Sequence, residues 1–307
     1  MALGLTLARS TFLLSSPSLL PSSLFLCPSL SLSRFSSDVK ESQGVTHMTP
    51  SISILRGGKG QEIYLVGTHA SDESGDVVEE VITTVKPDNV FLELCPKRAR
   101  ELRDGSNMGQ YDAFQSVSYI EGMIKNMGYN VPDSALQLSK AYFQSIGLIP
   151  GDAFKRAIEI VHQMREESGS SRPELIYGDI DGEKTILKIG ESVSLSSMFQ
   201  MINAAKRGGD YPEFRNDPVC QELARKLQDP HTSVEDKVEV LKNRQYLKVF
   251  SKVAHTIFPP GANALLTDRA AYMCDGLLEL KNETTVAVVG MAHMDGIEEQ
   301  WQKKSSH

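Results

Sequence analysis

The sequence predicts an α/β protein with a central, mostly buried β-sheet. Three observations predict this fold: strand-like and helix-like patterns alternate near the N-terminus, the middle of the chain has helical periodicity, and the most β-like run, residues 285–289, lies near the C-terminus. The 307 residues are 40% hydrophobic and 23% charged, which excludes a disordered, collagen-like or disulfide-scaffold chain. We therefore expect a large helical insertion between an N-terminal βαβ unit and a C-terminal strand.

The N-terminal part of this fold is predicted element by element. Residues 52–55 and 63–66, joined by a glycine-rich turn, are expected to form a hairpin. Ser74 can cap a helix whose valines and isoleucines follow a helical period until Pro87 ends it, and residues 90–92 form the next strand. Strand, helix and strand with short links form a βαβ unit, which favours a sheet buried on both faces.

The rest of the chain is predicted to be mainly helical. Apolar residues at three-to-four spacing predict helices at residues 111–125, 135–144, 153–164, 185–206, 217 onward, 233–254 and 265–280. A short strand at residues 175–177 interrupts them, and a short helix near Ile297 is expected after the run 285–289.

The first 37 residues have a composition of their own. Residues 1–37 contain 11 Ser, 11 Leu, two Arg and no Asp, Glu or Lys. An acid-free, serine-rich segment with arginines is typical of an organelle transit peptide. Because residues 33–37 resemble processing sites of plant mitochondrial leaders, we expect the mitochondrion, with the chloroplast as the alternative. The expected organisation is a disordered leader, a linker at 38–51, one domain at 52–300 and a tail at 301–307.

Charge and cysteine usage restrict the partners. The net charge of −7 leaves no basic field for nucleic acid, and no run of 18 apolar residues predicts a transmembrane helix, so a soluble protein is expected. Cys95, Cys220 and Cys274 are widely spaced, which argues against a cysteine-rich zinc site. An unidentified protein or peptide, as substrate or partner, is the expected ligand. The sequence does not specify the oligomeric state.

Two histidines stand at equivalent positions near the two ends of the fold. His69 follows Gly67 after one predicted strand, and His293 follows Gly290 after another. A glycine there allows a sharp backbone turn, and the carboxyl ends of strands are where open α/β sheets build their sites. The two imidazoles could bind a divalent metal or act as acid and base, or each is an ordinary half-buried histidine.

Three charged residues also stand next to predicted elements. Glu93 directly follows an apolar strand, so it either pairs with Arg98 or Arg100 or serves as a ligand or base. Asp179 also follows a strand and is either a helix N-cap or a site carboxylate. Arg269 opens a helix and is either solvated or the partner of an anion or site carboxylate.

As a set, these residues resemble the TraB/PrgY (TraB-domain) family over about residues 63–296. The resemblance rests on six stretches: Gly67-Thr68-His69, residues 87–98, residues 150–154, Gly178-Asp179, Asp268-Arg269 and residues 288–293. The family is related to the Tiki proteins and to the erythromycin-esterase/ChaN-like group, so the resemblance implies a sheet of that kind. A metalloprotease or metallohydrolase mechanism is proposed for the Tiki branch.

The resemblance implies a metal-dependent hydrolase of peptide or ester bonds. The catalytic groups and ligands of one divalent metal (Zn²⁺, Mn²⁺ or Co²⁺) would be His69, Glu93 and His293. The metal-bound water would then attack a carbonyl. The supporting residues would be Arg98, Asp179 and Arg269, with Gly67 and Gly290 in backbone turns.

The chain departs from the family pattern in three main respects, besides a conservative replacement of glutamate by Asp268. Its first histidine motif, ending at His69, is one residue shorter than Gly-x-x-His, Ala153 replaces a glutamate and Ile180 replaces an arginine. Because a one-residue deletion can redirect a side chain, we expect a divergent member with weakened catalysis. The alternative is a non-catalytic scaffold or regulator that binds a protein partner at an organelle. A metal-free acid/base enzyme is the third hypothesis.

Overall fold

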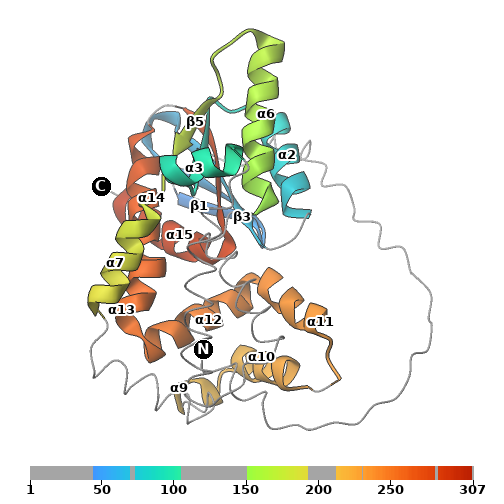
Figure 1. The fold of residues 1–307 in the computed structure, drawn as a ribbon, viewed down its shortest axis with the longest axis vertical. Coiled ribbons are helices and arrows are strands. Elements are labelled where there is room, and N and C mark those ends of the chain that lie inside the picture. The colour runs from blue at the N-terminus through green and yellow to red at the C-terminus, as the bar shows by residue number, and fades with distance from the viewer. Residues whose placement is uncertain are drawn as a thin grey trace, which may run out of the picture.

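The computed structural model describes residues 44–69, 73–104, 151–192, 212–229, 231–280 and 283–305. Within these ranges a six-stranded sheet is covered by helices on both faces (Figure 1), which confirms the predicted α/β class. The predicted leader at 1–37 and the predicted helices at 111–125 and 135–144 lie outside the described residues. None of the helices in the described ranges has the length and hydropathy needed to cross a membrane.

The sheet is mixed, with four parallel strands next to an antiparallel pair. Its strands are β1 (Gly44–Thr49), β2 (Ile52–Arg56), β3 (Glu62–Thr68), β4 (Asn89–Leu92), β5 (Glu174–Tyr177) and β6 (Thr284–Gly290). They follow the order β1-β2-β3-β6-β4-β5, and β3, β6, β4 and β5 run parallel. The strand nearest the C-terminus is therefore central, and the carboxyl ends of four strands meet at one edge.

The helices fall into two groups. Those that accompany the sheet are α2 (Glu73–Val85), α3 (Pro96–Arg103), α6 (Asp152–Ser168), α14 (Asp268–Glu279) and α15 (Met291–Ser305), and α7 (Gly182–Ser192) lies against the turns before α14. A separate helical part, drawn in the lower half of Figure 1, contains α9 (Pro212–Arg215), α10 (Pro218–Gln228), α11 (Val234–Glu239), η4 (Val240–Lys242) and α12 (Arg244–Ile257). The short turns η3 (Gly58–Gly60), α13 (Pro259–Ala262) and η5 (Asn263–Thr267) complete the set.

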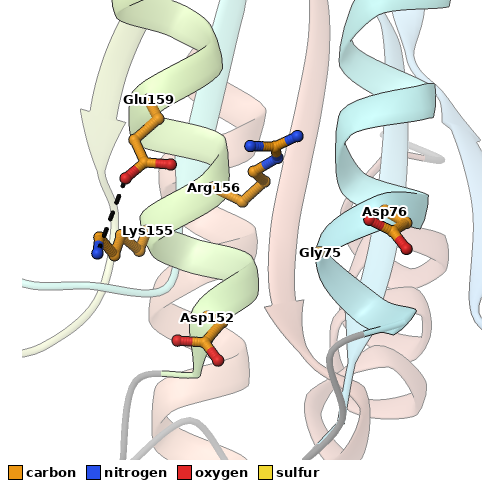
Figure 2. A pocket seen from close by; sticks show the side chains of 6 residues that line it. All are labelled: Gly75, Asp76, Asp152, Lys155, Arg156 and Glu159. Atoms are coloured by element: carbon orange, nitrogen blue, oxygen red, sulfur yellow. Dashed lines mark ion pairs between the residues drawn. The ribbon is translucent and has the colours of Figure 1, made fainter.

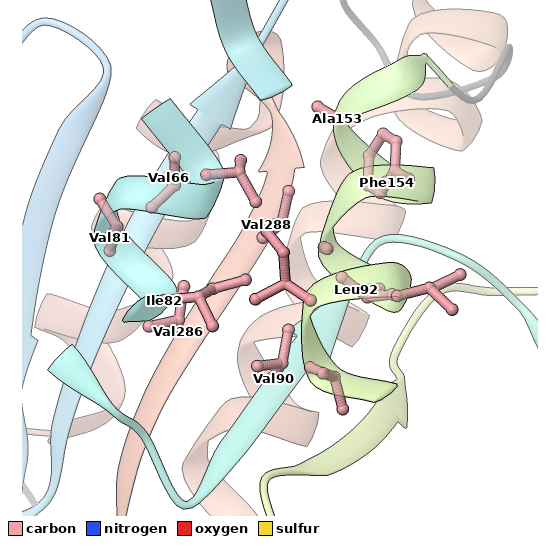
Figure 3. Close-up of a cluster of buried hydrophobic side chains, with 14 of the residues drawn as sticks. Val66, Val81, Ile82, Val90, Leu92, Ala153, Phe154, Val286 and Val288 are labelled. Carbon is pink, nitrogen blue, oxygen red and sulfur yellow. The ribbon is translucent and has the colours of Figure 1, made fainter. Parts of the chain in front are cut away.

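Apolar residues alternate between the two faces of the sheet. Val286 and Val288 of β6 point into one core with α2 and α6, whereas Ala287 and Val289 point into the other with α14 and α15. Figure 2 shows α2 and α6 side by side, and Figure 3 shows the strand valines packed beneath them. Burial of both faces explains why β6 reads as one continuous apolar run.

Four predicted details differ from the structure. Strand β1 occupies part of the stretch expected to be a linker, because it pairs with β2. The long helix predicted at 233–254 breaks at Asn243, whose side chain accepts a hydrogen bond from the Gln245 amide at 2.8 Å and so caps α12. The final helix has 15 residues, because its apolar period continues to the fully buried Trp301. The helix expected at 185–206 begins earlier, at Gly182, and is described as far as Ser192.

Gly67 and Gly290 were expected in backbone turns, but both lie inside strands. Gly67 is the sixth residue of β3, and Gly290 is the last of β6. At Gly67 the requirement is close packing, because a Cβ there would lie 2.2 Å from the Met294 sulfur of α15. The absent side chain lets α15 approach the sheet, which brings the start of that helix to the carboxyl edge.

Candidate functional site

One predicted site residue follows each of the four parallel strands, so four of them lie at the same edge of the sheet. His69 follows β3, Glu93 follows β4 and Asp179 comes two residues after β5, whereas His293 lies in the first turn of α15 after β6. The strand register supports this gathering, because Thr68 of β3 stands opposite Gly290 of β6. The expectation that these residues meet at the carboxyl edge therefore has a structural basis.

Arg269 of α14 bonds to two of the carboxylates at this edge. Its Nε donates to Asp179 Oδ1 at 3.0 Å and its Nη2 to Asp179 Oδ2 at 2.8 Å, while Nη2 also donates to Glu93 Oε1. The Arg269 side chain is 1% exposed. Burial alone would lower the pKa of Arg269, but the Asp179 and Glu93 carboxylates outweigh it and raise that pKa above its ordinary value. The guanidinium thus stays charged between two carboxylates.

Arg98 of α3 adds a second cation to Asp179. Its Nη1 donates to Asp179 Oδ2 at 3.0 Å. Burial would raise the pKa of Asp179, but Arg269 and Arg98 reverse that effect, so the net shift is downward. Asp179 is therefore an ion-pair partner rather than the cap of α7. Asp181 takes the capping position, since its Oδ1 accepts from the Glu183 amide at 3.0 Å.

Glu93 is fully buried, and both of its carboxylate oxygens have donors. Oε1 accepts from Arg269 and lies 3.3 Å from His293 Nε2, and Oε2 accepts from the Gly290 amide at 2.5 Å. Sequence reasoning considered Arg98 or Arg100 as its partner, but the ion pair is made by Arg269, 176 residues away. We call Glu93, Arg98, Asp179, Arg269 and His293 the buried cluster.

A π-helical turn precedes Arg269 and helps to hold it. Residues 263–267 form η5, and Arg269 Nη1 donates to the Leu265 carbonyl within this turn at 3.3 Å. A π-helical turn displaces the following side chains around the helix axis, and such turns are frequent at functional sites. The apolar period at 265–280 predicted a helix here but carried no signal for the π turn.

His69 lies at the same edge in a different environment. It is partly exposed, and its Nδ1 lies 3.3 Å from Ser74 Oγ. Burial lowers the pKa of His69, as does the positive charge of Lys242, while Glu73 and Glu239 act in the opposite direction. The neutral imidazole is therefore the favoured form at neutral pH. Lys242 belongs to η4, and its Nζ lies 3.9 Å from Glu73 Oε2, so the helical part approaches the start of α2.

The predicted metal ligands do not form a metal site as they are placed. Among the residues that the structure describes, no three His, Cys, Asp or Glu side chains are grouped so that they could hold a metal ion. The Glu93 oxygens are instead directed at Arg269 and at the Gly290 amide. His69, Glu93 and His293 thus do not fit a shared metal in this arrangement, and a bound divalent metal stays a prediction from the family resemblance.

A cavity of about 310 Å³ lies between the first turns of α2 and α6 (Figure 2). It is lined by Gly75, Asp76, Asp152, Lys155, Arg156 and Glu159. In the sequence Gly75 directly follows Ser74, the residue that contacts His69. Sequence reasoning did not predict this cavity. One available signal was Gly75, a residue without a side chain in the first turn of a predicted helix.

Comparison with known proteins identifies the family. The model of the TraB/PrgY/gumN family matches residues 53–305. The chain belongs to this family. The family match therefore covers all four strand-end residues and Arg269, and it agrees with the resemblance found in the sequence motifs.

Curated relatives of this TraB/PrgY/gumN protein are distant and longer. "Uncharacterized protein MJ1365" of Methanocaldococcus jannaschii is 27% identical over 251 residues, which cover 80% of this chain and 55% of that protein. "TraB domain-containing protein" of Homo sapiens is 25% identical over 264 residues, covering 79% of this chain and 63% of the human protein. The chain therefore spans less than two thirds of the length of these relatives.

Proposed function

We propose that this TraB/PrgY/gumN-family protein hydrolyses a peptide or ester bond, with His69 as the general base that activates water. The observation that carries the proposal is the placement of His69. Of the four strand-end residues, Glu93, Asp179 and His293 are buried, whereas His69 is partly exposed, and its partner Ser74 directly precedes Gly75, which lines the cavity. A general base must reach a water molecule and must be unprotonated.

The proposed reaction needs one proton carrier. His69 takes a proton from water as the oxygen adds to the carbonyl carbon, and the protonated imidazole then returns that proton to the departing amine or alcohol. The direction of the His69 pKa shift supports this role, because burial and Lys242 keep the ring neutral. The cavity between α2 and α6 carries charges of both signs, which suits a peptide substrate.

The buried cluster has a supporting role in this proposal. Glu93 and Arg269 tie the end of β4 to α14, and the Gly290 amide ties the same carboxylate to β6. These contacts hold the strand ends on which the carboxyl edge is built. A metal held by His69, Glu93 and His293 would supply an activated water, but the Glu93 oxygens would first have to leave Arg269 and Gly290.

A second function is favoured by the burial of that cluster. Glu93, Arg269 and His293 are each at most 1% exposed, and a side chain closed off from solvent does not contact a substrate directly. In this alternative the protein is a non-catalytic scaffold or regulator that binds a protein partner. For either function we propose the mitochondrion as the location, with the chloroplast as alternative, supported by the composition of residues 1–37.

Hydrolysis assays on a panel of peptides and aryl esters, run in buffer with excess EDTA, test the proposal. We expect turnover by the wild-type protein and a loss of about 100-fold or more in His69→Ala, the lower end of what a general base contributes. His162→Ala is the matched control, because His162 is an exposed histidine of α6. Activity that EDTA abolishes, or that His69→Ala retains, would contradict the metal-free mechanism. Wild-type protein that hydrolyses nothing, with or without added Zn²⁺, Mn²⁺ or Co²⁺, would favour the scaffold.

A further inference from the structure

We propose that Ser74 is a positioning residue that sets the tautomer of His69, so that Nδ1 carries the hydrogen and Nε2 presents its lone pair. The catalytic consequence of this inference rests on the proposed function, in which Nε2 would be the basic atom. The tautomer itself is a property of the folded protein and can be measured whether or not the protein is an enzyme.

Ser74 makes three polar contacts, all with one residue. Its Oγ lies 3.2 Å from the His69 amide nitrogen, 3.2 Å from the His69 carbonyl oxygen and 3.3 Å from His69 Nδ1. The serine is 4% exposed and is the second residue of α2. The hydroxyl therefore connects the start of α2 to the residue that follows β3.

Counting hydrogens selects one arrangement for these contacts. A serine hydroxyl donates one hydrogen and can accept two. The His69 amide can only donate, and the His69 carbonyl can only accept, so the single hydroxyl hydrogen goes to the carbonyl if both backbone contacts are made. The contact with Nδ1 is then a hydrogen bond only if Nδ1 carries a hydrogen and donates it to Oγ. In a neutral ring this leaves Nε2 without a hydrogen.

The opposite tautomer satisfies fewer of the contacts. With the hydrogen on Nε2, the hydroxyl would have to donate to Nδ1, and the approach of Oγ to the His69 carbonyl at 3.2 Å would bring two acceptors together without a hydrogen. Because Ser74 is buried, water does not readily replace the missing partner. The three contacts together thus favour the form with Nδ1–H.

The charged groups around His69 come from three elements. Glu73 lies next to Ser74 at the start of α2, and Glu239 and Lys242 come from α11 and η4. Lys242 Nζ lies 2.6 Å from Glu239 Oε1 and 3.9 Å from Glu73 Oε2, so these charges compensate one another. Ser74 Oγ lies within hydrogen-bond distance of the ring at 3.3 Å, so Ser74 is the residue to change.

Nitrogen-detected NMR of the ¹⁵N-histidine-labelled full-length protein tests this inference. In a neutral imidazole the protonated and unprotonated nitrogens have well-separated ¹⁵N shifts, so the tautomer is read directly, and His69→Gln assigns the signals. We expect Nδ1–H in the wild-type protein, a shift of the population toward Nε2–H in Ser74→Ala, and restoration in Ser74→Thr. Thr83→Ala is the control on the same helix, because Thr83 bonds to Glu79 and Glu80 carbonyls.

Three outcomes decide the inference. A wild-type His69 that carries its hydrogen on Nε2 would overturn it, and so would a folded Ser74→Ala protein with the wild-type tautomer. If the tautomer depends on Ser74 but no substrate is hydrolysed, the inference stands and the proposed function fails. If the protein is active, we expect kcat of Ser74→Ala to fall roughly 10-fold, as for other groups that orient a reacting side chain.

Discussion

Arg269 donates two parallel hydrogen bonds to Asp179, from Nε to Oδ1 at 3.0 Å and from Nη2 to Oδ2 at 2.8 Å, although the two residues are 90 positions apart in the sequence. The same guanidinium bonds to Glu93, so α14 is tied to the ends of two neighbouring strands. An arginine in this position serves two carboxylates at once, which a lysine with its single ammonium group cannot do in the same geometry.

Removing Arg269 is predicted to destabilise the fold strongly. Arg269→Met would leave Glu93 and Asp179 buried with too little positive charge, so we expect the free energy of unfolding in urea to fall by about 3–5 kcal/mol. Arg100→Met is the matched control, since Arg100 is exposed and bonds to a backbone carbonyl of its own helix, and should change stability by less than about 0.5 kcal/mol. Equal stabilities of the two variants would contradict a supporting role for the buried cluster.

Stability is predicted to fall in acid because of Asp179. Burial would raise the pKa of this carboxyl, but Arg269 and Arg98 hold it below its ordinary value of 3.8. As the pH drops, the unfolded chain takes up the proton first, so the stabilisation is complete above the ordinary value and is lost as the pH falls through the depressed one. Urea unfolding of wild type and Asp179→Asn between about pH 6 and pH 3 measures this. Asp179→Asn is expected to be less stable than wild type at pH 6 and to lose less free energy of unfolding on acidification. If the free energies of the two proteins fall in parallel with pH, the acid sensitivity does not come from Asp179.

The pKa of His69 is predicted to respond to Lys242. Burial is the largest cause that lowers this pKa below 6.5, and the Lys242 charge adds to it. Lys242→Met should therefore raise the pKa of His69, and Glu73→Gln should lower it further. Titration of the ring by NMR gives both values. An unchanged His69 pKa in Lys242→Met would contradict the approach of the helical part to His69, and an unchanged pKa in Glu73→Gln would contradict an effect of the first residue of α2.

Gly178 is predicted to accept no larger residue while Phe91 is present. A Cβ at Gly178 would lie 1.8 Å from the Phe91 ring, so Gly178→Ala should destabilise the protein by about 1–3 kcal/mol. Gly151→Ala is the control, because a Cβ there meets nothing within 4 Å. In the Phe91→Leu background the effect of Gly178→Ala should shrink, since the ring edge is gone. A full effect in that background would show that the clash is not with Phe91.

The sequence predicts the strands of this fold well because their signal is local. The apolar run before Glu93 and the run ending at Gly290 each identify a buried strand, and Glu93 directly after the first run and His293 three residues after the second mark the carboxyl edge. The family motifs also indicate that stretches far apart in the sequence belong to one site, which hydrophobic periodicity alone does not indicate.

The partners inside the site could not be predicted in the same way. Glu93 pairs with Arg269 across 176 residues, whereas sequence reasoning considered its neighbours Arg98 and Arg100. Ser74 was expected as a helix cap, but its hydroxyl bonds to His69. A side-chain partner depends on how helices pack on the sheet, and a single sequence carries little information about that packing.

The pH dependence of kcat/KM on the first substrate found is the most direct test of His69 as the base. We expect kcat/KM to rise with pH through a midpoint below 6.5, this midpoint to equal the His69 pKa measured by NMR, and the rise to disappear in His69→Ala. A midpoint that differs from the His69 pKa, or a pH profile that His69→Ala leaves unchanged, would contradict the role of His69 as the general base.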